Sequence, residues 1–344
     1  CALVCLLVRK KVCKRIIDTS AGDTSTDRAA VIAKRLIKSC IPVSAAAIVV
    51  NLSSFIDLIT IPRCLNFALS SDPGYFTACF SDIIKAQGGA VRLANFMYGS
   101  YTGLSWTMFM LIPSFTAMFG RSALPQIAGA WTLGNRKEFE RKVTVVLRSN
   151  FIIGFPLYLG LSAMSRQILE FLFSGRQQEV SVSATSLFIL GLGGVFLTLS
   201  STFISIFQVI GRSDLPVKLM LPGCAVKLIF NVFTISVPAI NINGAAVSTV
   251  IMYAAVALGG YFALENVTGI DFHIIRRMAV PLSAGIVCAV VSRIVYGFVR
   301  ESVNAVTALF LPIASGGAVY IILLIIFNEI NLKSLLNRQK RKKF

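Results

Sequence analysis

The sequence has few charged residues, and this shortage decides its solvent. Only 14% of its 344 residues are charged, whereas soluble domains carry about 25%. Hydrophobic residues make up 56% of the chain, and its mean hydropathy is +0.77. Because this apolar excess is more than one water-soluble core can bury, the composition indicates a protein that folds in lipid.

The residues and motifs that carry catalysis or hold metal ions are also scarce. His273 is the single histidine, and the chain contains no HExxH motif, no GxxxxGK motif and no Cys/His cluster. No apolar run carries two carboxylates. We therefore predict that the chain is not an enzyme and has no catalytic residue, metal site or cofactor, with Na⁺ or H⁺ left open as a coupling ion.

Acidic residues are outnumbered, with 15 Asp and Glu against 33 Lys and Arg, for a net charge of +18. Such a charge could indicate nucleic acid binding, but the basic residues gather in alternate segments between apolar runs. The segments that we predict to be cytoplasmic hold 25 of them, and the external segments hold 6. This bias follows the positive-inside rule. It predicts a multi-pass protein of the plasma (cytoplasmic) membrane with a cytoplasmic C-terminus, membrane lipids as partners and no nucleic acid partner.

Apolar runs long enough to cross a bilayer, about 20 residues, recur along the chain. The eight that we expect to span are 39–62, 99–120, 145–165, 184–210, 216–238, 244–264, 278–299 and 304–327. Stretches such as "VYIILLIIF" do not alternate, which excludes a membrane barrel. The opening CALVCLLV resembles the tail of a membrane helix whose start is missing. The predicted fold class is an all-α polytopic transmembrane helical bundle of about eight full membrane helices plus the end of one truncated helix.

The same pattern predicts how the chain is divided. The expected parts are the end of a truncated membrane helix at 1–8, a basic cytoplasmic linker at 9–38, a six-helix transporter lobe at 39–264, two additional membrane helices at 278–327, and a basic cytoplasmic tail at 328–344.

Asn243-Gly244 stands between two of the apolar runs. This dipeptide usually marks a β-hairpin, but both runs are about 20 residues, too long for ordinary strands. We therefore expect a tight external turn between two helices, in which Asn and Gly provide the positive φ.

Charged residues deep inside two of the spans are candidates for a functional role, whereas Arg293 in the span at 278–299 lies close enough to the outer face to snorkel. The first span carries Asn51, Ser53 and Asp57, and a carboxylate inside a membrane is costly and usually functional. Asp57 is expected in the outer third of this span, either facing a cavity or paired structurally. Lys227 and Asn231, four residues apart in another span, form a second pair. The Lys227 ammonium could attract an anionic head group such as a pyrophosphate, or it could pair with a carboxylate.

A stripe of small and polar residues follows one face of the span at 184–210, because its members are spaced by three and four. They are Gly191, Gly194, Thr198, Ser201, Ser205 and Gln208. Close helix packing and the wall of a hydrated cavity both explain this pattern. The substrate-cavity candidates are thus Asn51, Ser53, Asp57, Thr198, Ser201, Ser205, Gln208, Lys227 and Asn231.

Two long stretches resemble a known family. "YGSYTGLSWTMFMLIPSFTAMFGRSALPQIAGAWTLGNRKEFERK" is similar to the eighth helix and following loop of the oligosaccharide flippases, and "GRSDLPVKLMLPGCAVKLIFNVFTISVPAININGAAVSTV" is similar to their eleventh and twelfth helices. The resemblance is to the stage V sporulation protein B and polysaccharide flippase group. That group belongs to the superfamily containing lipid II flippases and multidrug and toxin extrusion transporters. Lipid II flippases carry a basic residue early in helix eight, whereas Ser100–Gly103 has none here.

The resemblance implies helices seven to fourteen of about fourteen, with a missing N-terminal lobe as the expected partner. It implies a flippase or exporter that moves an undecaprenyl-linked oligosaccharide, a polysaccharide or peptidoglycan precursor, across the membrane by alternating access. Such a protein would serve the cell envelope or sporulation. The alternatives are an ion-coupled multidrug antiporter and a non-transporting membrane scaffold in envelope or spore assembly.

Overall fold

The computed structural model describes residues 29–89, 92–121, 123–301, 303–327 and 329. The chain forms two compact units, residues 1–44 and 45–344. The described part of the first unit, residues 29–44, is helical. The predicted segment 1–8, the linker up to residue 28 and the tail at 328–344, apart from Glu329, lie outside the described residues.

All regular structure in the described ranges is helical, which confirms the predicted all-α class. The helices are α2 (Ala29–Ser71), α3 (Pro73–Gln87), α4 (Leu93–Ser100), the π-helix η2 (Tyr101–Trp106), α5 (Thr107–Arg121), α6 (Leu124–Thr132), α7 (Arg136–Ala163), α8 (Ser165–Leu172), α9 (Gln177–Val209), α10 (Asp214–Ile235), α11 (Asn243–Thr268), α12 (Ile274–Val299) and α13 (Ala305–Ile326).

Seven described helices are long and apolar enough to cross a membrane, namely α2, α7 and α9 to α13. The remaining expected span, 99–120, does not form a single helix. It falls on α4, η2 and α5, which follow one another directly. The π-helix between them widens the helical turn, and periodicity of apolar residues could not predict that break.

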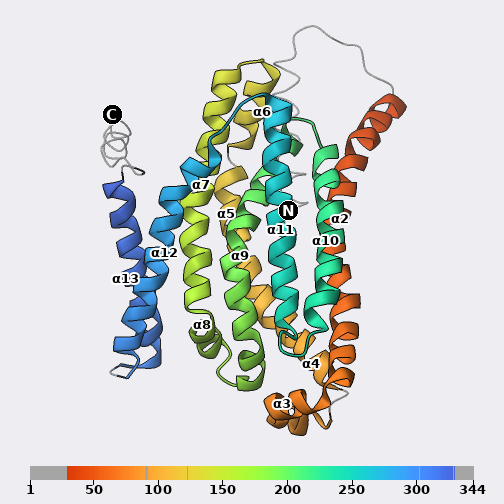
Figure 1. Ribbon diagram of the computed structural model, residues 1–344. Helices are drawn as coiled ribbons and strands as arrows, with labels where there is room; N and C mark the ends of the chain where they lie inside the picture. The colour runs from red at the N-terminus through yellow and green to blue at the C-terminus, as the bar shows by residue number, and fades with distance from the viewer. Residues whose placement is uncertain (1–28, 90–91, 122, 302, 328, 330–344) are drawn as a thin grey trace. The chain divides into compact units, whose positions relative to one another are not determined.

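Helix α9 is the centre of the second unit. It packs against α7 on one side and α11 on the other, and α10 packs on α11. On the far side of α7 lies α12, and α13 packs on α12 (Figure 1). Because α7 and α11 cover most of α9, its apolar window is two-thirds buried, the largest fraction among the seven candidate spans.

Glycines let the neighbours of α9 approach closely. A Cβ on Gly191 would lie 2.7 Å from Ser162 Cβ of α7, and one on Gly194 would overlap the ring of Tyr158. On the other side, a Cβ on Gly193 would overlap Val250 of α11. The glycine part of the predicted stripe therefore packs helices together, as small residues do in membrane bundles.

The turn between α10 and α11 differs from the expected one. Helix α10 ends at Ile235 and α11 begins at Asn243, so Asn243 and Gly244 lie in the first turn of α11. The positive φ belongs to Asn241, at 44°. Gly244 has another role, since a Cβ there would lie 2.6 Å from Thr234 Oγ1 of α10. The dipeptide allows close packing of two helices rather than the chain reversal itself.

Helix α2 extends beyond the predicted span, which ended at Pro62. The helix continues through Pro62 and Arg63 to Ser71, because proline inside a membrane helix is tolerated when neighbours satisfy the backbone. Asp57 is therefore well inside a helix rather than near its outer end. Helices α3, α6 and α8 occupy segments between the predicted spans.

Candidate functional site

A buried polar cluster joins three helices of the second unit. Asp57 lies on α2, while Lys227 and Asn231 lie one turn apart on α10. Ser248 comes from α11. Spacings of three and four residues put each helix's contributors on one face, so these polar side chains meet where α2, α10 and α11 come together.

The cluster is centred on an ion pair. Lys227 Nζ lies 2.6 Å from Asp57 Oδ2, and the ammonium also donates to Ser53 Oγ at 2.9 Å and to the Ser53 carbonyl at 3.4 Å. Its charge lies 5.7 Å from the centroid of the Trp106 ring, within reach of a cation–π attraction. The three donors of the ammonium thus have three acceptors.

Asn231 organises the other side of the carboxylate. Its Nδ2 donates to Asp57 Oδ1 at 3.0 Å and to Thr60 Oγ1 at 2.9 Å. Its Oδ1 accepts a hydrogen bond from Ser248 Oγ of α11. Both amide ends of Asn231 are used, so this side chain fixes the distance between α2 and α11.

The pair is sealed from solvent. Lys227 and Asn231 are 0% exposed and Asp57 is 5% exposed. Burying each charge costs several kcal/mol, which the mutual attraction recovers only when the remaining donors and acceptors are satisfied. In this cluster the remaining donors and acceptors are satisfied, and the positive and negative charges cancel. It therefore locks helices together and offers no uncompensated charge to a substrate.

A second polar feature is a cavity of about 650 Å³ among α5, α6, α7, α9, α10 and α11. Its lining is Met110, Pro113, Ser114, Thr116, Leu124, Val146, Asn150, Leu197, Ser200, Ser201, Thr202, Ile204, Ser205, Met220 and Tyr253. None of these residues is charged, and seven of them carry a side-chain hydroxyl or amide other than the phenol of Tyr253. The volume is within the range of about 300–1,000 Å³ found for small-molecule sites.

The hydroxyls of this cavity keep acceptor capacity. Ser201 donates to the Thr198 carbonyl at 3.1 Å, and Ser205 donates to the Ser201 carbonyl at 2.8 Å. Asn150 Nδ2 donates to Thr202 Oγ1 at 2.8 Å, while its buried Oδ1 has no hydrogen-bond partner among the described residues. A hydroxyl-bearing ligand could donate to the Ser201 and Ser205 hydroxyl oxygens, which keep lone pairs.

The predicted site residues separate into groups. The buried cluster contains Ser53, Asp57, Lys227 and Asn231, whereas the cavity lining contains Ser201 and Ser205. Thr198 is buried and faces Gly154 of α7, whose Cβ would lie 3.0 Å from its hydroxyl. Asn51 and Gln208 are exposed and belong to neither group.

The placement of Lys227 matches one of the two expectations for this residue, the ion pair. It pairs with a carboxylate, and that carboxylate belongs to the same chain. A pyrophosphate would have to displace Asp57 to reach the ammonium. Asp57 is likewise a buried partner and does not line the 650 Å³ cavity. The role of either residue toward a substrate stays a prediction.

Sequence reasoning missed several members. Thr60, Ser248 and Trp106 complete the buried cluster, but single hydroxyls and a tryptophan are ordinary in membrane helices, so nothing marked them. Asn150 could have been found, because an amide inside an apolar run needs a partner. It was overlooked because the mixed charges just before it dominate that segment.

Comparisons with known proteins agree with this architecture. The family model described as Lipid II flippase MurJ matches residues 90–315. The Lipid II flippase MurJ of Bacillus subtilis (strain 168) is 23% identical over 243 residues, covering 68% of this chain and 44% of that protein. The Uncharacterized membrane protein MJ1068 of Methanocaldococcus jannaschii is 28% identical over 153 residues, covering 44% of this chain and 29% of that protein.

A solved structure, Lipid II flippase MurJ in an inward closed conformation, matches with a TM-score of 0.53 and 18% identity. The match covers 69% of this chain and 50% of that one, and it bears on the fold alone. The chain spans about half the length of the relatives it matches. The matching family model lies within the superfamily that the sequence motifs resemble, and the stage V sporulation protein B subgroup stays a prediction. With a family model matching most of its length, this multi-pass membrane chain belongs to the lipid II flippase MurJ family.

Proposed function

We propose that the chain forms one lobe of a flippase that carries a lipid-linked saccharide precursor across the cytoplasmic membrane. Membership of a flippase family supports a transporter rather than an enzyme. The observation that carries the proposal is the uncharged cavity lined by hydroxyls and Asn150. Sugars are recognised through their hydroxyls, and a lining of neutral donors and acceptors replaces their hydration without binding an ion.

In this mechanism the saccharide enters the cavity while its lipid tail stays in the bilayer. Each hydrogen bond to a sugar hydroxyl contributes about 1 kcal/mol net, and leaving the tail in lipid avoids a cost of about 0.8 kcal/mol per methylene. A second lobe would close against the cavity from one side and then the other, as alternating access requires. The lipid-linked undecaprenyl saccharide and the N-terminal lobe are the proposed partners.

The neutral cluster fits this role as a rigid element. Because Lys227 and Asp57 neutralise each other, α2, α10 and α11 can move as one body when the lobes rock. An ion-coupled antiporter would need Asp57 to bind a proton or Na⁺, and the Lys227 ammonium occupies its Oδ2. The contacts of Asp57 therefore favour the flippase over the antiporter.

The test is to fill the cavity. In the intact protein in its native membrane, Ser201→Leu/Ser205→Leu should reduce the appearance of lipid-linked saccharide at the outer face at least about tenfold. Gln208→Leu is the matched control, because Gln208 lies on the same helix, is exposed and does not line the cavity.

The readout is labelling of the saccharide by a membrane-impermeant reagent, with membrane levels of each variant held equal. A lipid phosphate that lacks the saccharide serves as a second substrate arm. Wild-type transport by the doubly substituted protein would refute the proposal. Equal transport of the lipid phosphate would show that the saccharide is not what the cavity selects.

A further inference from the structure

A second concave site lies at the end of the unit where α7 meets α8, and it is separate from the hydroxyl-lined cavity. Its volume is about 460 Å³, and it is bordered by α7, α8, α9 and α12. Two arginines line it, Arg166 from α8 and Arg293 from α12. Ser165, Ser181 and Thr185 add hydroxyls to the same wall. The site thus combines positive charge with hydrogen-bonding groups.

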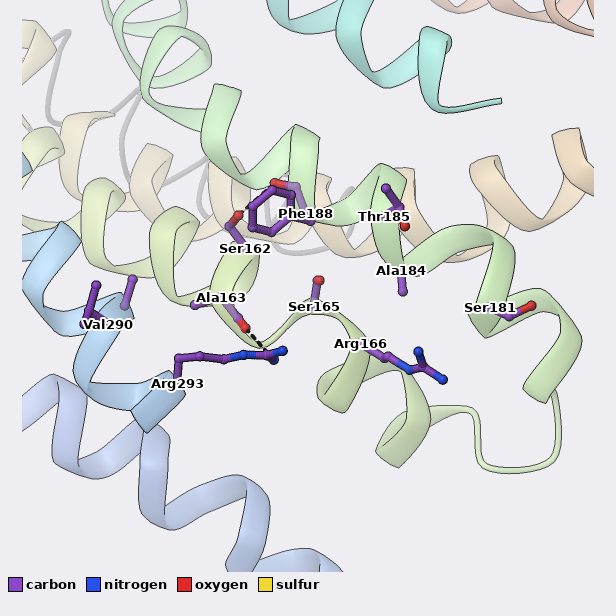
Figure 2. A pocket seen from close by; sticks show the side chains of 11 residues that line it. Ser162, Ala163, Ser165, Arg166, Ser181, Ala184, Thr185, Phe188, Val290 and Arg293 are labelled. Atoms are coloured by element: carbon purple, nitrogen blue, oxygen red, sulfur yellow. Dashed lines mark hydrogen bonds between the residues drawn. The ribbon is translucent and has the colours of Figure 1, made fainter. Parts of the chain in front are cut away.

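Arg293 makes one contact with the end of α7 at this pocket. Its Nη1 donates to the Ala163 carbonyl, at the last residue of α7, over 3.4 Å. Figure 2 shows Arg293 reaching from α12 toward this junction, with Ser165 nearby and Arg166 extending on the side of Ser181. The acidic group in contact is Glu170, whose Oε1 accepts from Arg166 Nε at 2.8 Å. One carboxylate against two guanidinium groups leaves the pocket positively charged.

Apolar side chains extend from this charged pocket along the membrane-facing surface. Phe188 of α9 and Val290 of α12 line the pocket and are 44% and 51% exposed. Ile286, one turn before Val290 on α12, is also exposed. Because residues four apart share a helix face, this stripe leads along α12 to Arg293. In a membrane-spanning helix, such an exposed apolar surface faces acyl chains.

We propose that this pocket binds the phosphate of an anionic glycerophospholipid, with the acyl chains lying along α9 and α12. A lone arginine near a helix end would simply extend to the membrane surface. Here the guanidinium contacts the Ala163 carbonyl and shares a pocket with a second arginine and with four hydroxyl-bearing residues, Ser162, Ser165, Ser181 and Thr185. Basic pockets between membrane helices on the cytoplasmic side bind anionic head groups by this combination, and the same charge and hydrogen-bond donors are present here. On the topology that the basic residues predict, the pocket opens at the outer leaflet.

The proposal does not depend on what the flippase carries, and its ligand differs from the proposed cargo. The phosphate would receive charge-assisted hydrogen bonds from Arg293 and Arg166. Glycerol hydroxyls of the head group would meet Ser165 and Ser181. A zwitterionic lipid adds a positive choline to the same phosphate, and that charge would face two guanidiniums. The pocket should therefore prefer phosphatidylglycerol over phosphatidylcholine.

Binding can be measured on purified protein in neutral detergent, with dioctanoyl phosphatidylglycerol, dioctanoyl phosphatidylcholine and inorganic phosphate as separate probes. We expect at least about tenfold tighter binding of phosphatidylglycerol than of phosphatidylcholine, and no binding of inorganic phosphate at the same concentration. Arg293→Gln/Arg166→Gln should remove that preference, and Arg293→Lys should keep part of it because the charge remains.

Two further variants protect the test from folding effects. Thr185→Trp, at an exposed lining position, should weaken phosphatidylglycerol binding by filling the pocket without changing charge. Arg300→Gln removes the same charge at the same end of α12 but outside the pocket, and should leave binding unchanged.

Each contrary outcome overturns the assignment. Equal binding of the two lipids by the unaltered protein would show that charge is not recognised. An undiminished preference in Arg293→Gln/Arg166→Gln would place recognition elsewhere, and an equal loss in Arg300→Gln would reduce it to surface charge. Binding of inorganic phosphate as tight as that of phosphatidylglycerol would mark a free-anion site instead of a lipid site.

Discussion

Removing either partner of the Lys227–Asp57 pair should destabilise the protein far more than removing both. At 2.6 Å and an effective dielectric of about 20, their attraction is about 6 kcal/mol. That gain is offset by a desolvation cost of several kcal/mol for each buried ion. The pair is therefore near balance as a whole, but either half alone is an uncompensated charge in a dry site.

The magnitudes follow from this balance. Asp57→Asn leaves the Lys227 ammonium fully buried without its counter-ion, and Lys227→Met leaves the carboxylate with the Asn231 amide but without its cation. Each should lower the free energy of unfolding by about 3–5 kcal/mol. The double variant should lose well under the sum of these values, so the coupling energy in the cycle should be about 3 kcal/mol or more.

The assay is reversible unfolding by SDS titration in mixed micelles, with the unfolding free energy determined for all four proteins. Glu138 and Arg141 provide a matched control cycle, because they are 2.8 Å apart but accessible to solvent, with the side chains 31% and 72% exposed. An exposed pair of this kind contributes about 0–1 kcal/mol. Losses below about 1 kcal/mol for each buried substitution, with simple additivity in the double variant, would refute the account of the cluster.

Two further predictions concern backbone geometry, and the same unfolding assay tests both. Gly191→Ala should lower the free energy of unfolding by about 1–3 kcal/mol, because the added Cβ meets the backbone of Ser162. The control Gly160→Ala, with open space around its Cβ, should be neutral or stabilise the protein by up to about 1 kcal/mol. Equal effects of the two substitutions would exclude close packing of α7 on α9 as the cause. Asn241→Val should lower the free energy of unfolding by about 1–2 kcal/mol, because a branched side chain disfavours the positive φ of this residue. Asn241→Gly should change it by less than about 0.5 kcal/mol. An unchanged stability of the valine variant would contradict the left-handed backbone at this position.

The sequence predicted the all-helical membrane class, because a long apolar run in lipid must form a helix to satisfy its own backbone hydrogen bonds. It failed where local geometry decides. The break at η2 leaves the apolar pattern of 99–120 intact, and the span predicted to end at residue 62 lies in α2, which continues to Ser71. At the α10–α11 turn, the dipeptide Asn243-Gly244 attracted the prediction, while Asn241, two residues earlier, adopts the strained backbone.

The candidate site was predicted residue by residue but not as an assembly. Asp57, Lys227 and Asn231 stood out because charges and amides are rare in apolar runs. Their mutual contact joins residues 170 or more positions apart, which no local pattern can reveal. Both explanations of the stripe on α9 apply, each to a different part. Gly191 and Gly194 pack against α7, whereas Ser201 and Ser205 line the cavity.

The ion pair also has a consequence for the order of synthesis. Asp57 emerges 170 residues before Lys227, which at about 5–20 residues per second is a delay of about 10–30 s. During that interval α2 must hold a carboxylate in the membrane without its cation. A carboxylate at the centre of an isolated helix opposes insertion by about 2.5–3.5 kcal/mol. Stable insertion of α2 in the bilayer should therefore await the synthesis of α10. A helix made early in translation is then held in the membrane by one made much later.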